Sequence, residues 1–340
     1  MSSQSNRSYK GLRFTRLVIP ATISVFILAT AISATSAADS STSNSAYDAS
    51  ANAACQPTHV YGPSTIDPLT ATDDQLQTAG FPVRPPGNDA TALNAWTTAM
   101  AHAKTWSAPE PICGSGAVNF TPAYSGNWAG HVANNTDFGN VNFTWSQSTW
   151  TQTSVPGDSH YTDFQQAPDS AIWTGLGVTS LIQAGIASIS TSTAQYRFWT
   201  EDYKNPPIFE GPVIRPGDVA YVYVQYLGNN SAYYFLENET TGLYQPFTNP
   251  APYVGWRAAN FINERVQGYY LPNFGSVGIA GNSFGTSTNT WSLTSALNQA
   301  WVMTSNCLST GNGLSVPSTV QSDSSFYQHW YQGSPFSDGC

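Results

Sequence analysis

A single glutamine inside an apolar segment is the residue of this chain with the clearest chemical potential. Gln183 stands in the run Ser180-Leu181-Ile182-Gln183-Ala184-Gly185, shortly after the turn-like stretch Trp173-Thr174-Gly175-Leu176-Gly177. A buried primary amide that makes no hydrogen bond destabilises a fold by roughly 1–3 kcal/mol. We therefore expect a buried glutamine to have a hydrogen-bond partner or a function. An amide N–H is also a donor that can stabilise negative charge developing on an oxygen atom. Gln183 is therefore a candidate catalytic residue.

A carboxylate and three indoles are the other candidates for a site. Glu201 lies in the strand-like run Tyr196-Arg197-Phe198-Trp199-Thr200-Glu201-Asp202-Tyr203, and a carboxylate of suitable pKa can transfer protons at a reacting group. Glu201 is therefore a second candidate residue. The indoles of Trp173 and Trp199 stand in the same two segments, and that of Trp128 lies earlier in the chain. The alternatives are a satisfied core amide for Gln183, core packing for the indoles and a solvated strand end for Glu201.

These segments resemble the glutamic peptidases of family G1, the eqolisins, which are secreted acid endopeptidases. Their Trp-x-Gly-Ile-Asp-Gly and Ile-Leu-Gln-Thr-Gly segments correspond to residues 173–177 and 180–185, and their Ala-Trp-Tyr-Glu-Trp-Tyr-Pro strand corresponds to 196–203. The resemblance implies that Gln183 holds the attacking water and stabilises the oxyanion of a tetrahedral intermediate. It implies Glu201 as a second catalytic residue, and a cleft for an extended peptide lined by the indoles of Trp173, Trp199 and Trp128. It also implies a polypeptide substrate, an N-terminal propeptide and no metal or cofactor. Further matching blocks are Tyr124–Gly130, Ile214–Asp218, Leu236–Gly242 and Leu271–Gly275.

One acidic position of the family is missing from the chain. The family segment Ala-Glu-Trp-Ile-Val-Glu-Asp-Phe, whose first glutamate is taken as the catalytic base, falls on Tyr253–Phe261, and Gly255 stands in place of that glutamate. Gly177 replaces the aspartate of the earlier segment. Three interpretations follow: a non-catalytic relative that keeps the cleft, a base supplied by Glu201 or Glu264, or a different placement of the segment. The expected function is an acid endopeptidase-like protein that is catalytically impaired.

Other function classes fit the residues less well. A lectin-like, carbohydrate- or peptide-binding module is the main rival, because aromatic residues make up 13% of the chain. A glycosidase needs two carboxylates roughly 5–10 Å apart, for which Glu201 with Glu237 or Glu239 is the available pair. A serine hydrolase and a pepsin-like peptidase are disfavoured because the chain has no Gly-x-Ser-x-Gly, Asp-Thr-Gly or Asp-Ser-Gly motif. His131 is expected to be a surface residue.

The elements that would position these residues are mainly strands. From Tyr124 onward, short β-rich runs alternate with Gly, Pro and Asn turns. The pattern predicts an all-β fold of two packed antiparallel sheets, and the family resemblance implies a concanavalin-like, lectin-like β-sandwich. Only 89–104, with Asp89 as its N-cap, and 258–266 have helical patterns. The expected strands are 141–151, 171–176, 180–189, 194–203, 219–227, 232–239, 274–281, 289–294, 299–305 and 316–331.

Three regions follow one another along the chain. Residues 1–38 have four basic residues, an apolar run and small residues, which is typical of a cleaved secretory signal; an uncleaved anchor is the alternative. Residues 39–122 are expected to be a propeptide-like region with one helix, or else a small fixed subdomain. Residues 123–340 are expected to form the sandwich. We therefore predict a secreted protein without stable membrane association.

Charge and cysteine content indicate which kinds of ligand and cross-link the chain can have. The part after the signal carries 7 basic and 20 acidic residues, a net charge of −13, and no basic cluster that would bind nucleic acid. Charged residues are only 9% of the chain, so we expect tolerance of acid. Four cysteines in an exported chain predict two disulfides, most simply within Cys55/Cys113 and Cys307/Cys340. No cysteine has zinc-site spacing, and a monomer is expected.

Overall fold

The computed structural model describes residues 59–60, 66–103, 105–106, 112–113, 124–177, 180–202, 205–251, 257–266, 270–305 and 312–332. The predicted leader, Gly255 and the side chains of all four cysteines lie outside the described residues. No helix among the described residues is long and apolar enough to cross a membrane.

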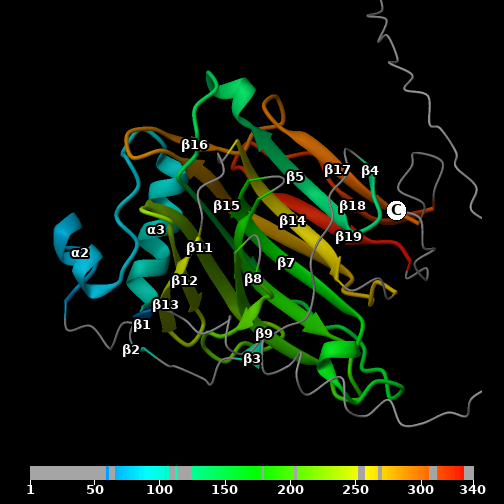
Figure 1. Cartoon of the computed structure of the whole chain (residues 1–340). Coiled ribbons are helices and arrows are strands. Elements are labelled where there is room, and N and C mark those ends of the chain that lie inside the picture. Colours follow the sequence, from blue (N-terminus) through cyan, green and yellow to red (C-terminus); the bar gives the residue numbers. More distant parts are fainter. Residues whose placement is uncertain are drawn as a thin grey trace, which may run out of the picture. The chain divides into compact units, whose positions relative to one another are not determined.

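The described chain is built almost entirely of strands, which lie in two sheets (Figure 1). Neighbouring strands pair antiparallel, except for β13 with β2 and β17 with β4. The first sheet, sheet A, contains β13 (Leu243–Pro250), β12 (Ser231–Asn238), β11 (Val219–Gly228), β6 (Trp145–Thr151), β15 (Ser276–Gly285), β19 (Phe326–Trp330), β18 (Gly313–Pro317) and β17 (Gln299–Thr304), with the short β1 (His59–Val60), β2 (Thr105–Trp106), β4 (Tyr124–Ser125) and β16 (Thr290–Ser292).

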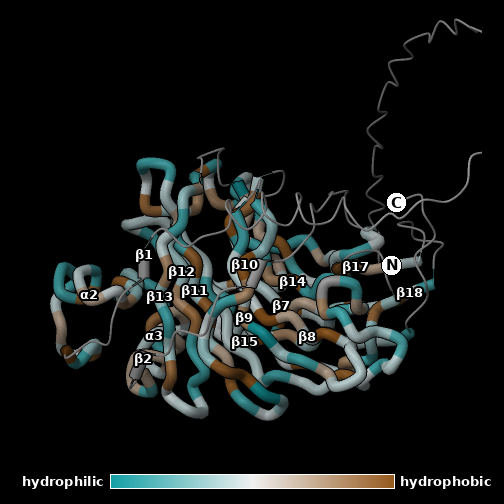
Figure 2. The backbone as a smooth tube through the Cα atoms, turned by 60° about the horizontal axis from the view of Figure 1, so that its bottom comes forward, coloured by the Kyte–Doolittle hydropathy of each residue, from teal (hydrophilic) through white to brown (hydrophobic). Residues whose placement is uncertain are grey.

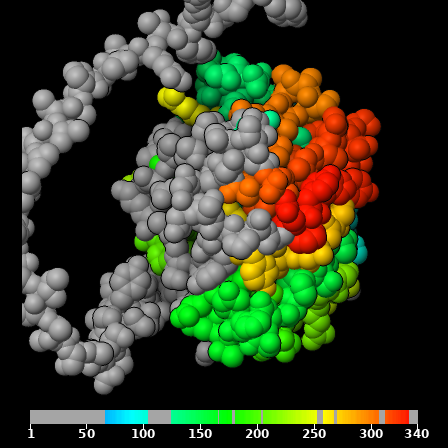
Figure 3. Space-filling view, turned by 90° about the vertical axis from the view of Figure 1, so that its right-hand side faces the viewer, coloured from blue at the N-terminus to red at the C-terminus, as the bar shows by residue number. Residues whose placement is uncertain are grey.

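The second sheet, sheet B, carries the candidate site. In spatial order it contains β3 (Ile112–Cys113), β10 (Ile208–Phe209), β9 (Gln195–Asp202), β8 (Ile182–Ile189), β7 (Asp169–Leu176), β14 (Ala258–Val266), β5 (Trp128–Asn134) and β17. Strand β17 pairs in both sheets and joins them along one side. In Figure 3, orange and red residues from the last part of the chain lie next to one another, as the pairing of β17, β18 and β19 requires.

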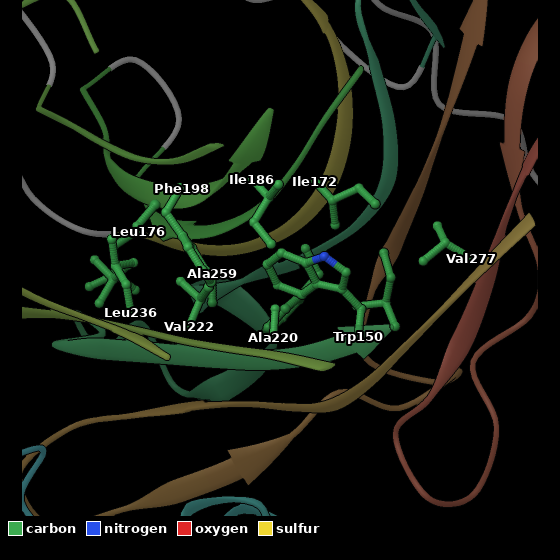
Figure 4. Close-up of a cluster of buried hydrophobic side chains, with 14 of the residues drawn as sticks. Trp150, Ile172, Leu176, Ile186, Phe198, Ala220, Val222, Leu236, Ala259 and Val277 are labelled. Carbon is green, nitrogen blue, oxygen red and sulfur yellow. The ribbon is translucent and has the colours of Figure 1, made fainter. Parts of the chain in front are cut away.

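The main core lies between the two sheets. Side chains of sheet A, such as Trp150 and Val222, point toward those of sheet B, such as Ile172, Ile186 and Phe198 (Figure 4). Alternation along each strand sends the other residues to the outer faces. In Figure 2 hydrophobic residues recur along strands such as β8, whereas many connecting loops are hydrophilic. The predicted all-β fold of two packed antiparallel sheets is confirmed.

Side chains of β11 (Val219–Gly228) alternate between the two faces of sheet A. Val222 and Val224 belong to the core between the sheets, whereas Tyr221 and Tyr223 lie on the outer face of sheet A. The turn at Pro216–Asp218 precedes this strand, and the amide of Asp218 donates to the carbonyl of Arg215.

Two helices cover the outer face of sheet A. Helix α3 (Ala90–His102) begins at the predicted N-cap, where the Asp89 carboxylate accepts from the amides of Thr91 and Ala92. Helix α2 (Asp73–Ala79) was not predicted. It begins with a capping box formed by Thr72 and Gln75 and ends at Gly80. Two short 3-10 turns, η1 (Asn135–Phe138) and η2 (Phe164–Gln166), lie in loops.

The helix predicted over 258–266 is wrong, because this segment is strand β14. Ala258, Phe261 and Ile262 have helical spacing, yet alternate residues face opposite sides. Ala259 and Phe261 enter the core between the sheets, whereas Ala258 and Ile262 enter the cluster on the outer face. A central strand that is buried on both faces reads as an apolar run and cannot be told from a helix by periodicity alone.

Two further expectations are corrected. The strand expected over 316–331 is a pair, β18 and β19, separated by a turn. His131 is not a surface residue: it is 3% exposed. Its Nδ1 lies 2.6 Å from Asn298 Oδ1, and its Nε2 lies 2.9 Å from the Ser318 carbonyl oxygen. Burial lowers its pKa below the ordinary 6.5, and the contact with the Ser318 carbonyl joins β5 to the loop after β18.

Candidate active site

Gln183 and Glu201 are direct neighbours on the outer face of sheet B. The register pairs Gln183 of β8 with Glu201 of β9 on one side and with Gly175 of β7 on the other. Ile182, Ala184 and Ile186 fill the core, so alternation sends the Gln183 side chain outward. Its Nε2 donates to Glu201 Oε2 at 2.6 Å. The structure thus brings together the two residues that the sequence suggests as catalytic.

The three expected indoles lie on the same face. Trp199 of β9 and Trp173 of β7 flank Gly185 of β8 in one cross-strand row, next to the row of Gln183. Trp128 of β5 contacts Trp173 edge-on, with ring centroids 4.9 Å apart. Trp301 of β17 extends the group, since its ring lies 5.6 Å from that of Trp128. Sequence reasoning missed Trp301, which no motif marks.

Gly185 has a steric reason to be glycine. A Cβ atom there would lie 2.0 Å from the Ile172 carbonyl oxygen and 2.6 Å from Trp173 Cβ. Any side chain at this position would therefore push β8 away from β7 and disturb Trp173. The glycine lets the two strands approach closely beside Gln183.

Glu264 organises the indoles from β14. Its Oε2 accepts from Trp173 Nε1 at 2.9 Å, and its Oε1 accepts from Asn127 Nδ2 at 3.1 Å. Trp128 is a further hydrogen-bond partner of this carboxyl group. Asn127 is itself held, because Ser125 Oγ donates to its Oδ1 at 2.7 Å. Glu264, which the sequence suggests only as a substitute base, is thus bound by the expected substrate-binding indoles.

The site favours protonated carboxyl groups. Burial raises the pKa of Glu201 well above its ordinary 4.5, and the negative charge of Glu264 adds to this effect, while the bond from Gln183 opposes it. Burial likewise raises the pKa of Glu264 to about 7, although its indole and amide donors oppose the shift. Asp169 of β7, on the same face, has its pKa raised by burial and by Glu264. Burial therefore favours the protonated form of all three carboxyl groups.

Access to the amide is restricted. Gln183 is 1% exposed, although it lies on an outer face and not between the sheets, whereas Glu201 keeps partial exposure. The Oε1 atom of Gln183 is buried without a hydrogen-bond partner. The pair therefore reaches the solvent through Glu201.

The backbone conformation at position 177 explains why a glycine stands there. Its φ is +103°, a conformation that glycine adopts readily and other residues rarely do.

Asn260 of β14 lies in the same cross-strand row as Gln183, with Gly175 between them. Asn260 Nδ2 donates to the Gly177 carbonyl oxygen at 2.6 Å. An amide thus occupies the β14 position nearest to Gln183 on this face.

Other groupings suggested by the sequence do not form. Glu237 and Glu239 project from β12 and its end toward the outer face of sheet A, where Glu237 is paired in register with Tyr221 and Tyr244. They lie on the opposite sheet from Glu201, so a glycosidase pair with Glu201 is excluded. Among the described residues, no three His, Cys, Asp or Glu side chains are placed to share a metal ion.

Comparison with known proteins places the chain among peptidases. A model of the Peptidase A4 family matches residues 126–335. The solved structure of scytalido-glutamic peptidase with a transition state analog inhibitor is 20% identical, with a TM-score of 0.49, covering 61% of this chain and 98% of that chain. SCP-B, an eqolisin in complex with the tripeptide Ala-Ile-His, is 19% identical, with a TM-score of 0.45 and the same coverage.

A third solved structure is similar over a shorter part. Aspergilloglutamic peptidase from Aspergillus niger is 22% identical, with a TM-score of 0.40, covering 48% of this chain and 99% of that chain. No curated protein matches the sequence.

Proposed function

Because the chain belongs to the Peptidase A4 family, we propose that it is a secreted glutamic-peptidase-like protein that binds polypeptides and hydrolyses them slowly in acid. The observation that carries the proposal is the 2.6 Å hydrogen bond between Gln183 and Glu201 beside the indoles of Trp173 and Trp199. Water attack on a peptide carbonyl needs a carboxyl group that transfers protons and a donor that stabilises the oxyanion, and this pair has both kinds of group.

The two residues would divide the work as follows. A glutamine side chain has two N–H donors, so Gln183 has one left for the oxyanion of a tetrahedral intermediate while the other bonds to Glu201. Glu201 in its ionised form would take a proton from the attacking water, and in its protonated form would give one to the leaving nitrogen. The indoles of Trp173, Trp199 and Trp128 would flank the peptide.

The raised pKa of Glu201 sets the direction of the pH dependence. Water attack needs the ionised carboxylate, and burial makes this form scarce in strong acid. Hydrolysis should therefore be slow at pH 3 and increase as the pH rises toward the pKa of Glu201. The missing carboxylate at Gly255 is a second reason to expect low turnover.

A binding protein without turnover is the second candidate. The observation that favours it is the burial of Gln183, whose amide is only 1% exposed. In that case an extended peptide would bind over this face without being cleaved, and the indoles of Trp128, Trp173 and Trp199, which are 1%, 1% and 4% exposed, would have to be uncovered first.

One experiment separates these functions. The secreted full-length protein is incubated with an unfolded, reduced protein at pH 3 to 7, and both retention on an immobilised peptide column and new peptide fragments are measured. Cleavage that Gln183→Ala removes, and that the exposed control Gln321→Ala keeps, supports the peptidase. Retention without fragments supports the binding protein. Retention only on a glycan column would overturn both and favour the lectin-like alternative.

A further inference from the structure

The outer face of sheet A carries a dense aromatic surface that belongs to the sandwich but is covered by the N-terminal region. We call its six residues the sheet A aromatic patch; they are Trp145, Tyr221, Tyr223, Tyr233, Phe235 and Tyr244. All six are buried, in one cluster with residues of the segment 66–103, and Figure 1 shows α3 beside the strands of sheet A. Without that segment the sandwich would expose a contiguous apolar patch, which soluble monomers rarely do.

Apolar side chains of the N-terminal region fit this patch closely. The Phe81 ring contacts those of Tyr244 and Phe235, with centroids 5.0 and 6.1 Å away. Trp96 of α3 is 1% exposed, and its Nε1 donates to the Pro82 carbonyl oxygen at 2.9 Å, which fixes the chain before α3 against the helix. Leu76, Ala92 and Met100 complete the buried side of the helices.

Hydrogen bonds fasten the two parts at separate points. Gln147 Nε2 in β6 donates to the Ala92 carbonyl oxygen at 3.0 Å, and Tyr233 Oη donates to the Gly80 carbonyl oxygen at 2.5 Å. At the start of α3, Ser292 Oγ donates to Asp89 Oδ2 at 2.7 Å. Asp89 carries the only carboxylate among these bonds. Acid therefore removes little of what holds the helices on the sheet.

The N-terminal region also completes the edges of both sheets. Strand β1 pairs with Phe247 and Thr248 of β13, and β2 pairs with the other end of β13, so they cover the edge of sheet A. Strand β3 pairs with β10 and covers the edge of sheet B. An uncovered strand edge is prone to pair with other chains.

We propose that residues 59–113 are a permanent part of the folded protein and stay bound to residues 124–332 when the chain between Cys113 and Tyr124 is cut. The region then acts as a non-covalent subunit of the processed protein and not as a propeptide that leaves. This inference does not depend on the proposed peptidase activity.

A specific cut tests the proposal. The recognition sequence of a specific protease is inserted between Cys113 and Tyr124 of the full chain, and the cut protein is passed over a gel-filtration column at pH 4 and pH 6 with a reducing agent, which breaks any disulfide. We expect two bands on a denaturing gel and one common elution peak at both pH values. Two separate peaks, with the 124–340 part still folded by circular dichroism, would overturn the proposal.

A substitution in the contact sharpens the test. Trp96→Ala removes a buried indole, and we expect the cut fragments to dissociate with a Kd at least about a hundredfold higher. The control is Thr97→Ala, one residue further along α3 on its exposed side, which should leave the Kd unchanged. If Trp96→Ala does not fold, the elution of the cut wild-type chain decides alone. Equal Kd values for both variants would contradict the assigned contact.

Discussion

The amide nitrogen of Gln183 lies 2.6 Å from the carboxyl oxygen of Glu201, its direct neighbour across β8 and β9. The two groups come from motifs that are eighteen residues apart in the sequence, and the antiparallel register of the hairpin brings them together. Their hydrogen bond joins a donor that suits an oxyanion to a carboxyl group that suits proton transfer.

The charge of Glu264 should be visible in the titration of Glu201. The negative charge of Glu264 raises the pKa of Glu201, so Glu264→Gln should lower that pKa, though burial keeps it above 4.5. The shift is measured by carbon-13 NMR of labelled glutamate side chains between pH 3 and 9. Asp323→Asn, at an exposed turn, is the control and should have no effect. An unchanged Glu201 midpoint in Glu264→Gln would show that the two carboxyl groups do not interact.

Glu264 should also hold the indoles of Trp128 and Trp173 in their edge-on arrangement. Both Glu264 oxygens accept N–H bonds, so Glu264→Gln turns one acceptor into a donor facing a donor. We expect the near-UV circular dichroism of the indole pair to weaken. In the wild type the same signal should change with pH, with a midpoint near the Glu264 pKa of about 7. If the variant keeps both the signal and its pH dependence, Glu264 does not position the indoles.

Stability should decrease from mild acid to neutral pH. Glu237 and Glu239 on sheet A have raised pKa values, that of Glu239 being about 7, because burial disfavours their charged forms. The folded state binds these protons more tightly than the unfolded state. Its stability is therefore full below the ordinary pKa of 4.5 and is lost as the pH rises toward 7. A shift of this size corresponds to roughly 3 kcal/mol for Glu239.

Thermal unfolding measured from pH 4 to 8 checks this direction. The wild-type Tm should fall across the range, and Glu239→Gln should flatten the curve because the amide does not ionise. Asp158 provides the opposite case, since hydrogen bonds from Tyr270 and His160 lower its pKa to about 2. Asp158→Asn should therefore leave the slope of Tm against pH unchanged between pH 4 and 8. A Tm that rises toward neutral pH would refute the role of the buried carboxyl groups.

Gly185 should tolerate no side chain. In Gly185→Ala the new methyl group would clash with the Ile172 carbonyl oxygen and Trp173 Cβ. Strands β7 and β8 cannot easily move apart, because β7 also pairs with β14 and β8 also pairs with β9. We expect destabilisation of about 1–3 kcal/mol, the range typical of overpacking, measured by urea unfolding. Gly87→Ala is the matched control, because no atom lies within 4 Å of its added Cβ. Equal stability of the two variants would mean that β7 and β8 separate without cost.

Local patterns predicted much of this fold. The alternation of β11, the Asp89 cap and most strands of the sandwich follow from periodicity and turn residues. Strand β14 was mistaken for a helix because both of its faces are buried, one in the core between the sheets and the other in the cluster on the outer face of sheet B, a property that appears only when the sheets are assembled. Helix α2, by contrast, has a local sequence signal, the capping box of Thr72 and Gln75, but it was not predicted.

The site was predictable where motifs mark it and not where register creates it. Gln183, Glu201, Trp173, Trp199 and Trp128 could be chosen from local sequence, and the structure places them on one face. The roles of Glu264 and Asn260 depend on which residues of β14 oppose β7, and no local pattern contains that information. Their roles, like those of the five motif residues, stay predictions until variants are measured.

The central claim is that Gln183 acts in the cleavage of polypeptides. Its most direct test is kcat/KM for an unfolded protein substrate near pH 5, compared between the wild type and Gln183→Ala after both are shown to be folded. We predict slow but measurable cleavage by the wild type and a loss of about a hundredfold or more in the variant, the size expected for removing an oxyanion donor. Equal rates in the two proteins, or no cleavage by the wild type between pH 3 and 7, would contradict the claim.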